Sequence, residues 1–256
     1  MKLIVLGSGT STGVPRIGNE WGECDPAEPK NRRTRVSIIV ESSQGTRILV
    51  DTPPDLRSQF LSAGISAVDA VVWTHDRADH CHGIDDLRPI SLGRGQPISL
   101  YARRSVLETL AIRFSYIFKG SDLYPAVAQP EVIDDELTLG DARIRFADQP
   151  HGGITSLGIR LDEGDRSAGY AIDFHDLTDD MRTLYDGCDV WIADCLGRRP
   201  HPTHAHLDAV IEWAREMRAG KLYLSHMNNS MDFRTLLNEL PDWAEPAHDG
   251  LEIELS

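Results

Sequence analysis

The sequence predicts an α/β fold in which mixed β-sheets carry helices on their outer faces. Short runs of β-branched residues recur along the chain, and stretches with helical spacing of apolar residues lie between several of them. Two neighbouring runs, residues 35–41 and 46–50, are joined by the segment SSQG, which is typical of a hairpin. Later runs are separated by whole helices, so strand pairs and crossovers occur in the same protein.

The apolar periodicity predicts the following elements in chain order. Strands are expected at residues 2–6, 35–41, 46–50, 69–74, 143–147, 157–161, 168–172, 188–193 and 221–224. Helices are expected at residues 55–63, 103–114, 178–185 and 207–218. Residues 115–130 carry aromatics, Gly and two Pro without clean periodicity and predict an irregular segment, which either caps a pocket or forms a surface loop. The alternation before and after about Gly140 suits two similar halves.

Length and composition favour one compact domain over residues 1–256. The chain has 41% hydrophobic and 26% charged residues, no low-complexity tract and no linker, which is typical of a globular protein. Its four cysteines form no CxxC pair, so neither a disulfide framework nor a cysteine zinc site is indicated. The first apolar run ends at Gly7 and is too short for a signal peptide or a membrane span. We expect a cytoplasmic protein with reduced thiols and no membrane partner.

The formal net charge of −14 argues against binding to polymeric nucleic acid. Such binding depends on clustered Lys and Arg that displace counterions from phosphates. A small anionic substrate remains compatible with this charge, because a metal ion or a local Arg cluster can make one pocket positive.

The most informative segment is VVWTHDRADHCHG. An apolar run ends at Thr74 and is followed at once by His75, Asp79 and His80, so a strand delivers polar side chains into a loop. Histidine together with carboxylate is the ligand set of zinc, manganese or iron. Taken alone, the segment is as compatible with an ordinary polar loop as with a metal site.

Three further candidates stand at the ends of other predicted strands. His151 and Asp173 follow the runs at 143–147 and 168–172, and His226 follows the run at 221–224. A single histidine at a strand end is more often structural. Repetition of this placement over some 150 residues favours convergence of the side chains on one metal site.

Beyond these residues, the chain resembles the metallo-β-lactamase superfamily, whose signature HxHxDH is followed by a His, an Asp and a final His in the same order. The segments GSGTSTGVPRIG, NRRTRVSIIV, LVDTPPDLR, GIDDLRPI, HPTH and LSHMNNSMDF resemble the PhnP-type phosphodiesterase branch over almost the whole chain. The resemblance implies a four-layer αββα sandwich and a hydrolase. Some members of the branch carry a structural zinc on a cysteine cluster, but only Cys24 stands in that region, so we expect this site to be missing.

The resemblance also implies the roles of individual residues. One Zn²⁺ or Mn²⁺ ion would be held by His75, residue 77 and His151, and a second by Asp79, His80 and His226, with Asp173 bridging both. His204, in HPTH, matches a histidine thought to protonate the leaving group, and Asp51, which closes ILVD, would hydrogen-bond near the ligands. Asp194 also ends a predicted strand, WIAD, and there we favour a structural role.

Arg77 departs from the family pattern, because a guanidinium stays protonated and cannot ligate a cation. Three outcomes are open. His75, His151 and Asp173 still hold a weaker first ion, or Arg77 replaces one divalent charge by pairing with Asp173 or a substrate phosphate, or activity is lost. We favour the second outcome, with a single ion at Asp79, His80, Asp173 and His226, because a fixed cation repels a second one.

The expected activity is hydrolysis of small cyclic or nucleotide-like phosphodiesters by attack of a metal-bound hydroxide, with Asp79, Arg77 and His204 as catalytic residues. Two alternatives stay open: the same fold acting on thioesters or lactones, and a binding protein whose metal use is impaired by Arg77. A homodimer is compatible with the sequence.

Overall fold

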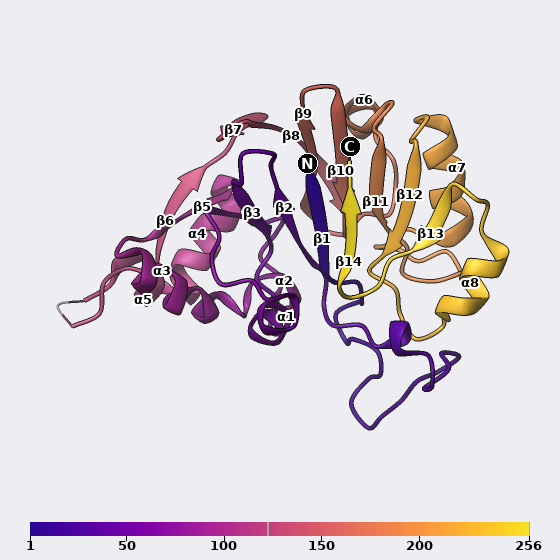
Figure 1. The fold of residues 1–256 in the computed structure, drawn as a ribbon, viewed down its shortest axis with the longest axis horizontal. Helices are drawn as coiled ribbons and strands as arrows, with labels where there is room; N and C mark the ends of the chain where they lie inside the picture. The colour runs from indigo at the N-terminus through magenta and orange to yellow at the C-terminus, as the bar shows by residue number, and fades with distance from the viewer. Residues whose placement is uncertain (122, 256) are drawn as a thin grey trace.

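The computed structural model describes residues 1–121 and 123–255 and contains two seven-stranded sheets (Figure 1). The first sheet has the order β14 (Leu251–Glu254), β1 (Lys2–Gly7), β2 (Ser37–Glu41), β3 (Arg47–Val50), β4 (Ala70–Val72), β5 (Ile98–Ala102) and β6 (Ala128–Val132). The second has the order β13 (Ala244–Pro246), β12 (Lys221–Ser225), β11 (Val190–Asp194), β10 (Arg166–Ala171), β9 (Ile154–Glu163), β8 (Ala142–His151) and β7 (Glu136–Leu139).

The two sheets repeat one pairing pattern. In the first sheet, neighbours from β14 to β3 are antiparallel and neighbours from β3 to β6 are parallel. In the second, neighbours from β7 to β10 are antiparallel and neighbours from β10 to β13 are parallel. The chain therefore contains two similar halves that divide between β6 and β7, except that β14 returns to the edge of the first sheet, and β3 corresponds to β10.

Strand periodicity explains how each sheet buries both of its faces. On β1, Leu3 and Val5 point into the core between the two sheets, whereas Ile4 and Leu6 point toward the helices outside the first sheet. A third apolar cluster lies between the second sheet and its own helices and includes the fully buried Trp191. These three clusters separate four layers.

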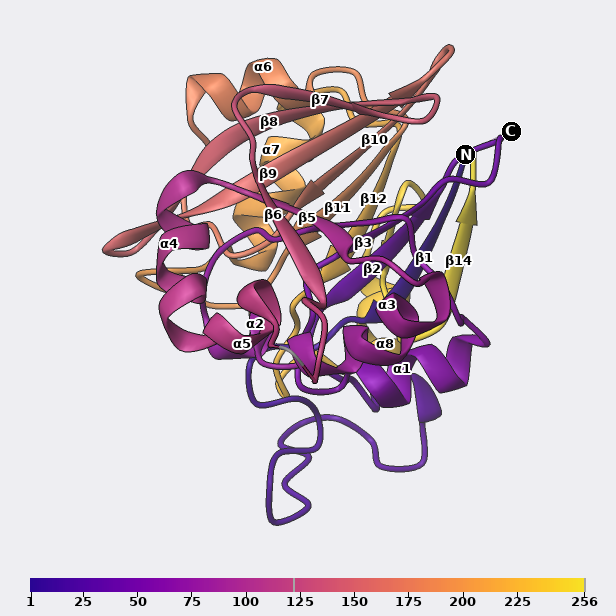
Figure 2. The same ribbon diagram turned by 90° about the vertical axis from the view of Figure 1, so that its left-hand side faces the viewer.

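The outer layers are helical (Figures 1 and 2). The first sheet carries α1 (Leu56–Ala63), α2 (Ala78–Cys81), α3 (Arg88–Arg94), α4 (Arg104–Arg113) and α5 (Ser115–Lys119). The second carries α6 (Asp179–Tyr185), α7 (Leu207–Glu216) and α8 (Phe233–Glu239). Two 3₁₀ turns, η1 (Pro29–Asn31) and η2 (Ile84–Leu87), lie in connections. The predicted four-layer αββα sandwich is confirmed, whereas the single-domain assignment stays a prediction.

Some expectations were wrong in detail. Residues 115–130 are not wholly irregular, because α5 and the start of β6 lie within them. The short helix α8 escaped prediction although it has a clear start: the Asp232 side chain accepts a hydrogen bond from the Thr235 amide. The four cysteines are free thiols, as expected. Within the described ranges, no helix has the length and apolar character needed to cross a membrane.

Candidate metal centre

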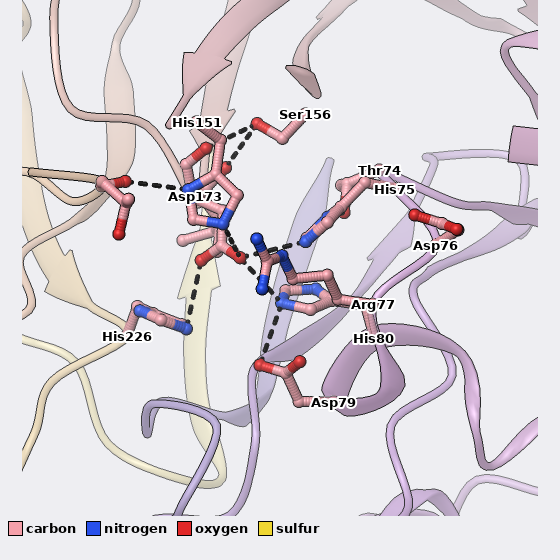
Figure 3. A network of polar contacts seen from close by, with 12 residues as sticks. Thr74, His75, Asp76, Arg77, Asp79, His80, His151, Ser156, Asp173 and His226 are labelled. Carbon is pink, nitrogen blue, oxygen red and sulfur yellow. Dashed lines mark hydrogen bonds and ion pairs between the residues drawn. The ribbon is translucent and has the colours of Figure 1, made fainter. Parts of the chain in front are cut away.

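The six predicted ligand side chains gather at one edge of the two sheets (Figure 3). They come from five segments of the chain, all at or just beyond strand ends: His75 after β4, Asp79 and His80 in α2, His151 at the end of β8, Asp173 after β10 and His226 after β12. The structure thus brings together residues that are as much as 151 positions apart in sequence, His75 and His226.

The backbone turns sharply just after three strands, β3, β10 and β12. Asp51, Asp173 and His226 have φ values of 64°, 59° and 56°, in the left-handed region that side chains other than Gly, Asn and Asp rarely adopt. Asp51 follows β3 and Asp173 follows β10, so the two aspartates occupy corresponding places in the two halves. Such strained residues persist where the surroundings hold them, and they cluster at functional sites.

Four imidazoles surround one carboxylate. The Nε2 atoms of His75, His80 and His151 lie 3.1, 3.2 and 3.5 Å from Oδ2 of Asp173. The Nε2 atom of His226 lies 3.1 Å from the other oxygen, Oδ1. Both oxygens of Asp173 therefore have histidine nitrogens beside them, as a bridging ligand requires.

The Nδ1 atoms of three imidazoles are hydrogen-bonded. For His75 the partner is the Thr74 hydroxyl at 2.9 Å, for His80 it is Oδ2 of Asp51 at 2.7 Å, and for His151 it is the Thr203 carbonyl at 2.8 Å. Nδ1 of His226 lies 3.4 Å from Oδ1 of Asp194 without a hydrogen bond between them. Since Nδ1 is held in the first three rings, their Nε2 atoms are directed toward the centre, as in proteins that bind metals through histidine.

Several polar atoms at this centre are buried without a hydrogen-bond partner. They include Nε2 of His75, His80 and His226 and Oδ1 of Asp173, and these four residues are at most 2% exposed. An unsatisfied buried polar atom costs on the order of 1–3 kcal/mol, so such a concentration calls for a ligand. Nitrogen and carboxylate donors that converge in this way fit a divalent transition-metal ion.

The pKa shifts show the same concentration of charge. Burial alone lowers the pKa of His80, but the carboxylates of Asp173, Asp79 and Asp51 raise it well above the ordinary value. Burial also lowers the pKa of His226, and two neighbouring carboxylates raise it to about 9. Burial raises the pKa of Asp173, but the imidazoles of His226 and His80 hold it well below the usual range. These shifts favour protonated imidazoles beside ionised carboxylates at this centre.

Three groups of donors share Asp173, and in each the ligand atoms lie within 4.8 Å of one another. Asp79, His80, Asp173 and His226 form the first group, His75, His151 and Asp173 form the second, and Asp173, Asp194, His204 and His226 form the third. The second group has only three residues, and an arginine occupies position 77. Figure 3 shows the Arg77 side chain extending toward the cluster. Arg77 is exposed, and the ion pairs among the described residues include none between it and Asp173.

His204 lies beside the cluster and not within its first group of ligands. Its ring centroid is 4.9 Å from that of His151 and 4.8 Å from that of His226. Its Nδ1 lies 2.8 Å from Oδ2 of Asp194, so Nε2 is the ring nitrogen left for a ligand.

Asp194 is the residue that sequence reasoning missed. It is fully buried, and its two oxygens face His204 and His226, so it orients two imidazoles and is not merely structural. A signal was present in the sequence: WIAD ends in a carboxylate after a buried strand, as ILVD does at Asp51. Asp194 and Asp51 are therefore both carboxylates that end a strand and orient a histidine of the centre.

Comparison with known proteins gives a consistent result. Residues 46–227 match the family model described as the β-lactamase superfamily domain. The chain is 32% identical over 262 residues to an octanoyltransferase of Porphyromonas gingivalis, in an alignment that covers 98% of this chain and 51% of that protein. It thus spans about half of that relative. It is also 27% identical over 313 residues to coenzyme PQQ synthesis protein B of Xanthomonas axonopodis pv. citri, with full coverage of both.

Solved structures extend the comparison. A crystal structure described as a new diphosphatase from the PhnP family is 35% identical, with a TM-score of 0.90 and coverage of 98% of this chain and 96% of that chain. Zn²⁺-bound PqqB from Methylobacterium extorquens is 18% identical with a TM-score of 0.75 and full coverage of both chains. The latter is a likeness of fold alone.

Proposed function

Because the chain belongs to the metallo-β-lactamase superfamily, and within it to the PhnP-type branch, we propose that it is a metal-dependent hydrolase of small phosphodiesters. One observation carries this proposal: the buried Nε2 atoms of three histidines lie 3.1–3.2 Å from the Asp173 carboxylate and have no hydrogen-bond partner. A cluster of this kind has little use in a folded core without a cation.

We assign metal to two of the three donor sets, one with four residues and one with three. Asp79, His80, Asp173 and His226 would hold one Zn²⁺ or Mn²⁺ ion. When bound there, a divalent ion lowers the pKa of water and offsets the negative charge of a phosphate. His75 and His151 would complete a second position only weakly, because the neighbouring guanidinium of Arg77 repels a further cation.

In this proposal the guanidinium of Arg77 supplies the positive charge that a second metal ion would otherwise supply. Its side chain extends toward the cluster and is not tied to a carboxylate of the described chain, so its donors are available to a phosphate oxygen. A guanidinium matches phosphate geometry with two parallel hydrogen bonds. Removing one charge contact of this kind from a transition state commonly costs about 3 kcal/mol, roughly a hundredfold in rate.

His204 is placed to give a proton to the leaving oxygen. Asp194 occupies Nδ1 at 2.8 Å and fixes the ring, which leaves Nε2 to face a substrate bound at the cluster. Imidazole is suited to proton transfer near neutral pH. With this proton, the leaving group departs as an alcohol and not as an alkoxide.

The substrate is expected to be small. A chain of net charge −14 has no general attraction for a nucleic-acid backbone, and the solved PhnP-family relative is described as a diphosphatase. Small cyclic phosphates and nucleotide-like diesters are compatible with the charge of the chain, and the relative's description adds that a phosphorylated small molecule is a substrate in this branch.

The proposal is tested by screening bis(p-nitrophenyl) phosphate and 2′,3′-cyclic nucleotides with metal-free protein reconstituted with Mn²⁺ or Zn²⁺. We expect turnover that requires metal and is abolished in His80→Ala. Turnover no greater than that of the His80→Ala control, across these diesters and both metals, would count against the proposal.

A second candidate is the hydrolysis of acyl compounds such as thioesters or lactones. The name of the Porphyromonas gingivalis relative favours it, although this chain spans only about half of that protein. A divalent ion held by the same donors would polarise a carbonyl. A panel of acyl thioesters and lactones, run beside the diesters, separates the two by the ratio of their kcat/KM values.

A third candidate is a binding protein in which Arg77 has ended efficient metal use. Arg77→His separates this case: a large rise in metal content and rate would indicate a relaxed catalytic site. Under the main proposal the same change lowers the rate, because the guanidinium contact is lost.

A further inference from the structure

The loop that follows His226 is held by the long connection between β1 and β2. Figure 1 shows this connection, residues 8–36, projecting below the two sheets toward α8. Its backbone contacts the loop directly, because the Glu23 amide donates to the Asn229 carbonyl at 2.8 Å. The approach is close, since a Cβ atom at Gly22 would lie 2.5 Å from the Asn229 carbonyl oxygen. The connection therefore supports the loop that leaves the metal centre.

Arg33 lies within this contact and is 2% exposed. Its Nη1 donates to the Asn228 carbonyl at 3.2 Å, and its Nη2 donates to the Met231 carbonyl at 2.5 Å. Nη2 also donates to Oδ1 of Asn31, on the same connection, at 3.3 Å. One guanidinium thus holds both ends of the turn formed by residues 228–231.

The buried charge of Arg33 has no carboxylate partner. Within residues 1–121 and 123–255, no Asp or Glu oxygen lies within 4.0 Å of its nitrogens, and its Nε is buried without a hydrogen bond. Burial lowers the pKa of the guanidinium below its ordinary value, but arginine stays protonated. A buried charge is costly, and here hydrogen bonds to neutral oxygens offset that cost. The charge therefore holds the two carbonyls more strongly than a neutral donor would.

His226 depends on its backbone more than the other three imidazoles of the centre do. Its Nδ1 lies 3.4 Å from Oδ1 of Asp194 without a hydrogen bond, whereas Nδ1 of each of the other three rings is hydrogen-bonded. Its φ of 56° lies in the left-handed region that histidine rarely adopts. Such a conformation persists where the surroundings hold it. The carbonyl two residues further on, that of Asn228, is the one that Arg33 binds.

We propose that Arg33 is a positioning residue of the metal centre. Through the turn at residues 228–231, it holds His226 in the backbone conformation that directs Nε2 to Oδ1 of Asp173, 3.1 Å away. None of its hydrogen bonds within the described chain reaches a predicted ligand, so it acts only through the backbone of the loop. The inference rests on the proposed function, because it concerns the site at which that function would take place.

The test is competition for Zn²⁺ with a chromophoric chelator, using wild-type, Arg33→Met and Arg33→Lys proteins. Methionine keeps much of the buried volume and removes the charged donors, whereas lysine keeps a charge but lacks the planar fork that reaches both carbonyls. We expect Arg33→Met to weaken Zn²⁺ binding roughly 10- to 100-fold, as does loss of other groups that orient a metal ligand. Arg33→Lys should recover part of this loss.

A double-mutant cycle with His226→Ala separates positioning from general destabilisation. If Arg33 acts through His226, Arg33→Met has no further effect on Zn²⁺ affinity once the imidazole is removed. An equal loss of affinity with and without His226 would overturn the inference, and so would wild-type affinity in a folded Arg33→Met protein. Should Arg33→Met not fold, the same cycle is run with Arg33→Lys, which has to show the same dependence on His226.

Arg160→Met is the matched control. The Arg160 side chain is 13% exposed, and its Nη1 donates to the carbonyls of Leu184 and Asp186 at 3.0 and 2.8 Å. It lies six residues beyond Ile154, at the end of β9 that is remote from the centre. We expect Arg160→Met to lower stability in urea and to keep the wild-type affinity for Zn²⁺. A loss of affinity as large as that of Arg33→Met would show that metal binding follows general stability, and would overturn the inference.

The visible spectrum of the Co²⁺-loaded protein gives a readout that does not depend on affinity. Its d–d bands report the number and geometry of the ligands, so saturating Co²⁺ reveals whether His226 still binds the ion. We expect the spectrum of Arg33→Met to shift toward that of His226→Ala, and the spectrum of Arg160→Met to match that of the wild-type protein. A wild-type spectrum in Arg33→Met would contradict the positioning role.

Affinity and turnover separate the two proposals. If Arg33→Met weakens Zn²⁺ binding through His226 but the wild-type protein cleaves none of the diesters, the positioning role holds and the proposed function fails. If the wild-type protein cleaves diesters and Zn²⁺ binds equally well to Arg33→Met, the proposed function holds and the positioning role is absent.

Discussion

Oδ2 of Asp51 lies 2.7 Å from Nδ1 of His80, and both side chains are fully buried. The other oxygen of Asp51 accepts a hydrogen bond from the Thr74 amide at 2.8 Å. The carboxylate thus joins the end of β3 to the loop after β4 and fixes the ring that supplies Nε2 to the centre. Asp51 touches no predicted metal position itself, so its role is to position His80.

We therefore expect Asp51→Asn to weaken metal binding. The asparagine NH₂ group would face the donors of Thr74 or His80, so the His80 ring would no longer be held in its present orientation. Loss of such a supporting partner commonly costs roughly 10- to 100-fold in metal affinity. Competition with a chromophoric chelator measures the change. Wild-type affinity in a folded Asp51→Asn protein would show that His80 is held by other contacts.

His204 and Asp194 are expected to act as one unit. His204→Ala should lower kcat by roughly 100-fold or more for a diester with an alkoxide leaving group, and much less for p-nitrophenolate, which needs no protonation. Adding Asp194→Ala to His204→Ala should lower the alkoxide rate further only through weaker metal binding, because the other oxygen of Asp194 faces the ligand candidate His226. Equal losses with both leaving groups would place His204 outside proton transfer.

Arg77 is expected to contribute charge and geometry at the phosphate. Arg77→Ala should lower kcat/KM roughly 100-fold, and Arg77→Lys should recover only part of the loss, because an ammonium lacks the two parallel donors. Steady-state kinetics on both variants, with circular dichroism to verify folding, provide the measurement. An unchanged kcat/KM in Arg77→Ala would contradict a catalytic role of the guanidinium.

Metal affinity should rise with pH. Free of metal, His226 has a pKa raised to about 9, and the pKa of His80 is also raised, so both imidazoles carry protons near neutral pH. An ion must displace these protons, and each proton released increases the apparent affinity about tenfold per pH unit below the pKa. Chelator competition between pH 6.5 and 8.5 measures this slope, and a flat profile contradicts protonation of the free centre.

Asp249 is expected to matter for stability and not for chemistry. Its carboxylate accepts hydrogen bonds from the amide and hydroxyl of Ser8 and from the amide and hydroxyl of Thr34, at 2.7–2.9 Å. Asp249→Ala leaves these buried donors unsatisfied and should reduce the free energy of unfolding by about 2–4 kcal/mol. Urea denaturation measures the loss, and Glu252→Ala, which affects an exposed ion pair with Lys2, should change stability by less than about 1 kcal/mol.

Much of the centre was predictable because its residues repeat one local pattern. An apolar run that ends at His75, Asp173 or His226 marks a strand that delivers a polar side chain to the sheet edge. The same pattern at Asp194 received a structural interpretation, since nothing in the local sequence shows that His204 and His226 lie on either side of it. Those contacts depend on the packing of β11 against β12.

Other features depend on long-range packing and leave little local signal. The edge strand β6 contains Pro130 and exposed side chains, which weaken its apolar periodicity, and pairing with β5 defines it.

The central claim is that the buried histidines and carboxylates hold a catalytic divalent ion. Its most direct test is the metal content of protein purified without chelators, measured by inductively coupled plasma mass spectrometry beside the His80→Ala variant. We predict about one equivalent of Zn²⁺ or Mn²⁺ per chain, lost in His80→Ala. A wild-type protein with no more metal than the variant would contradict the claim, and two equivalents would show that Arg77 leaves the second position open.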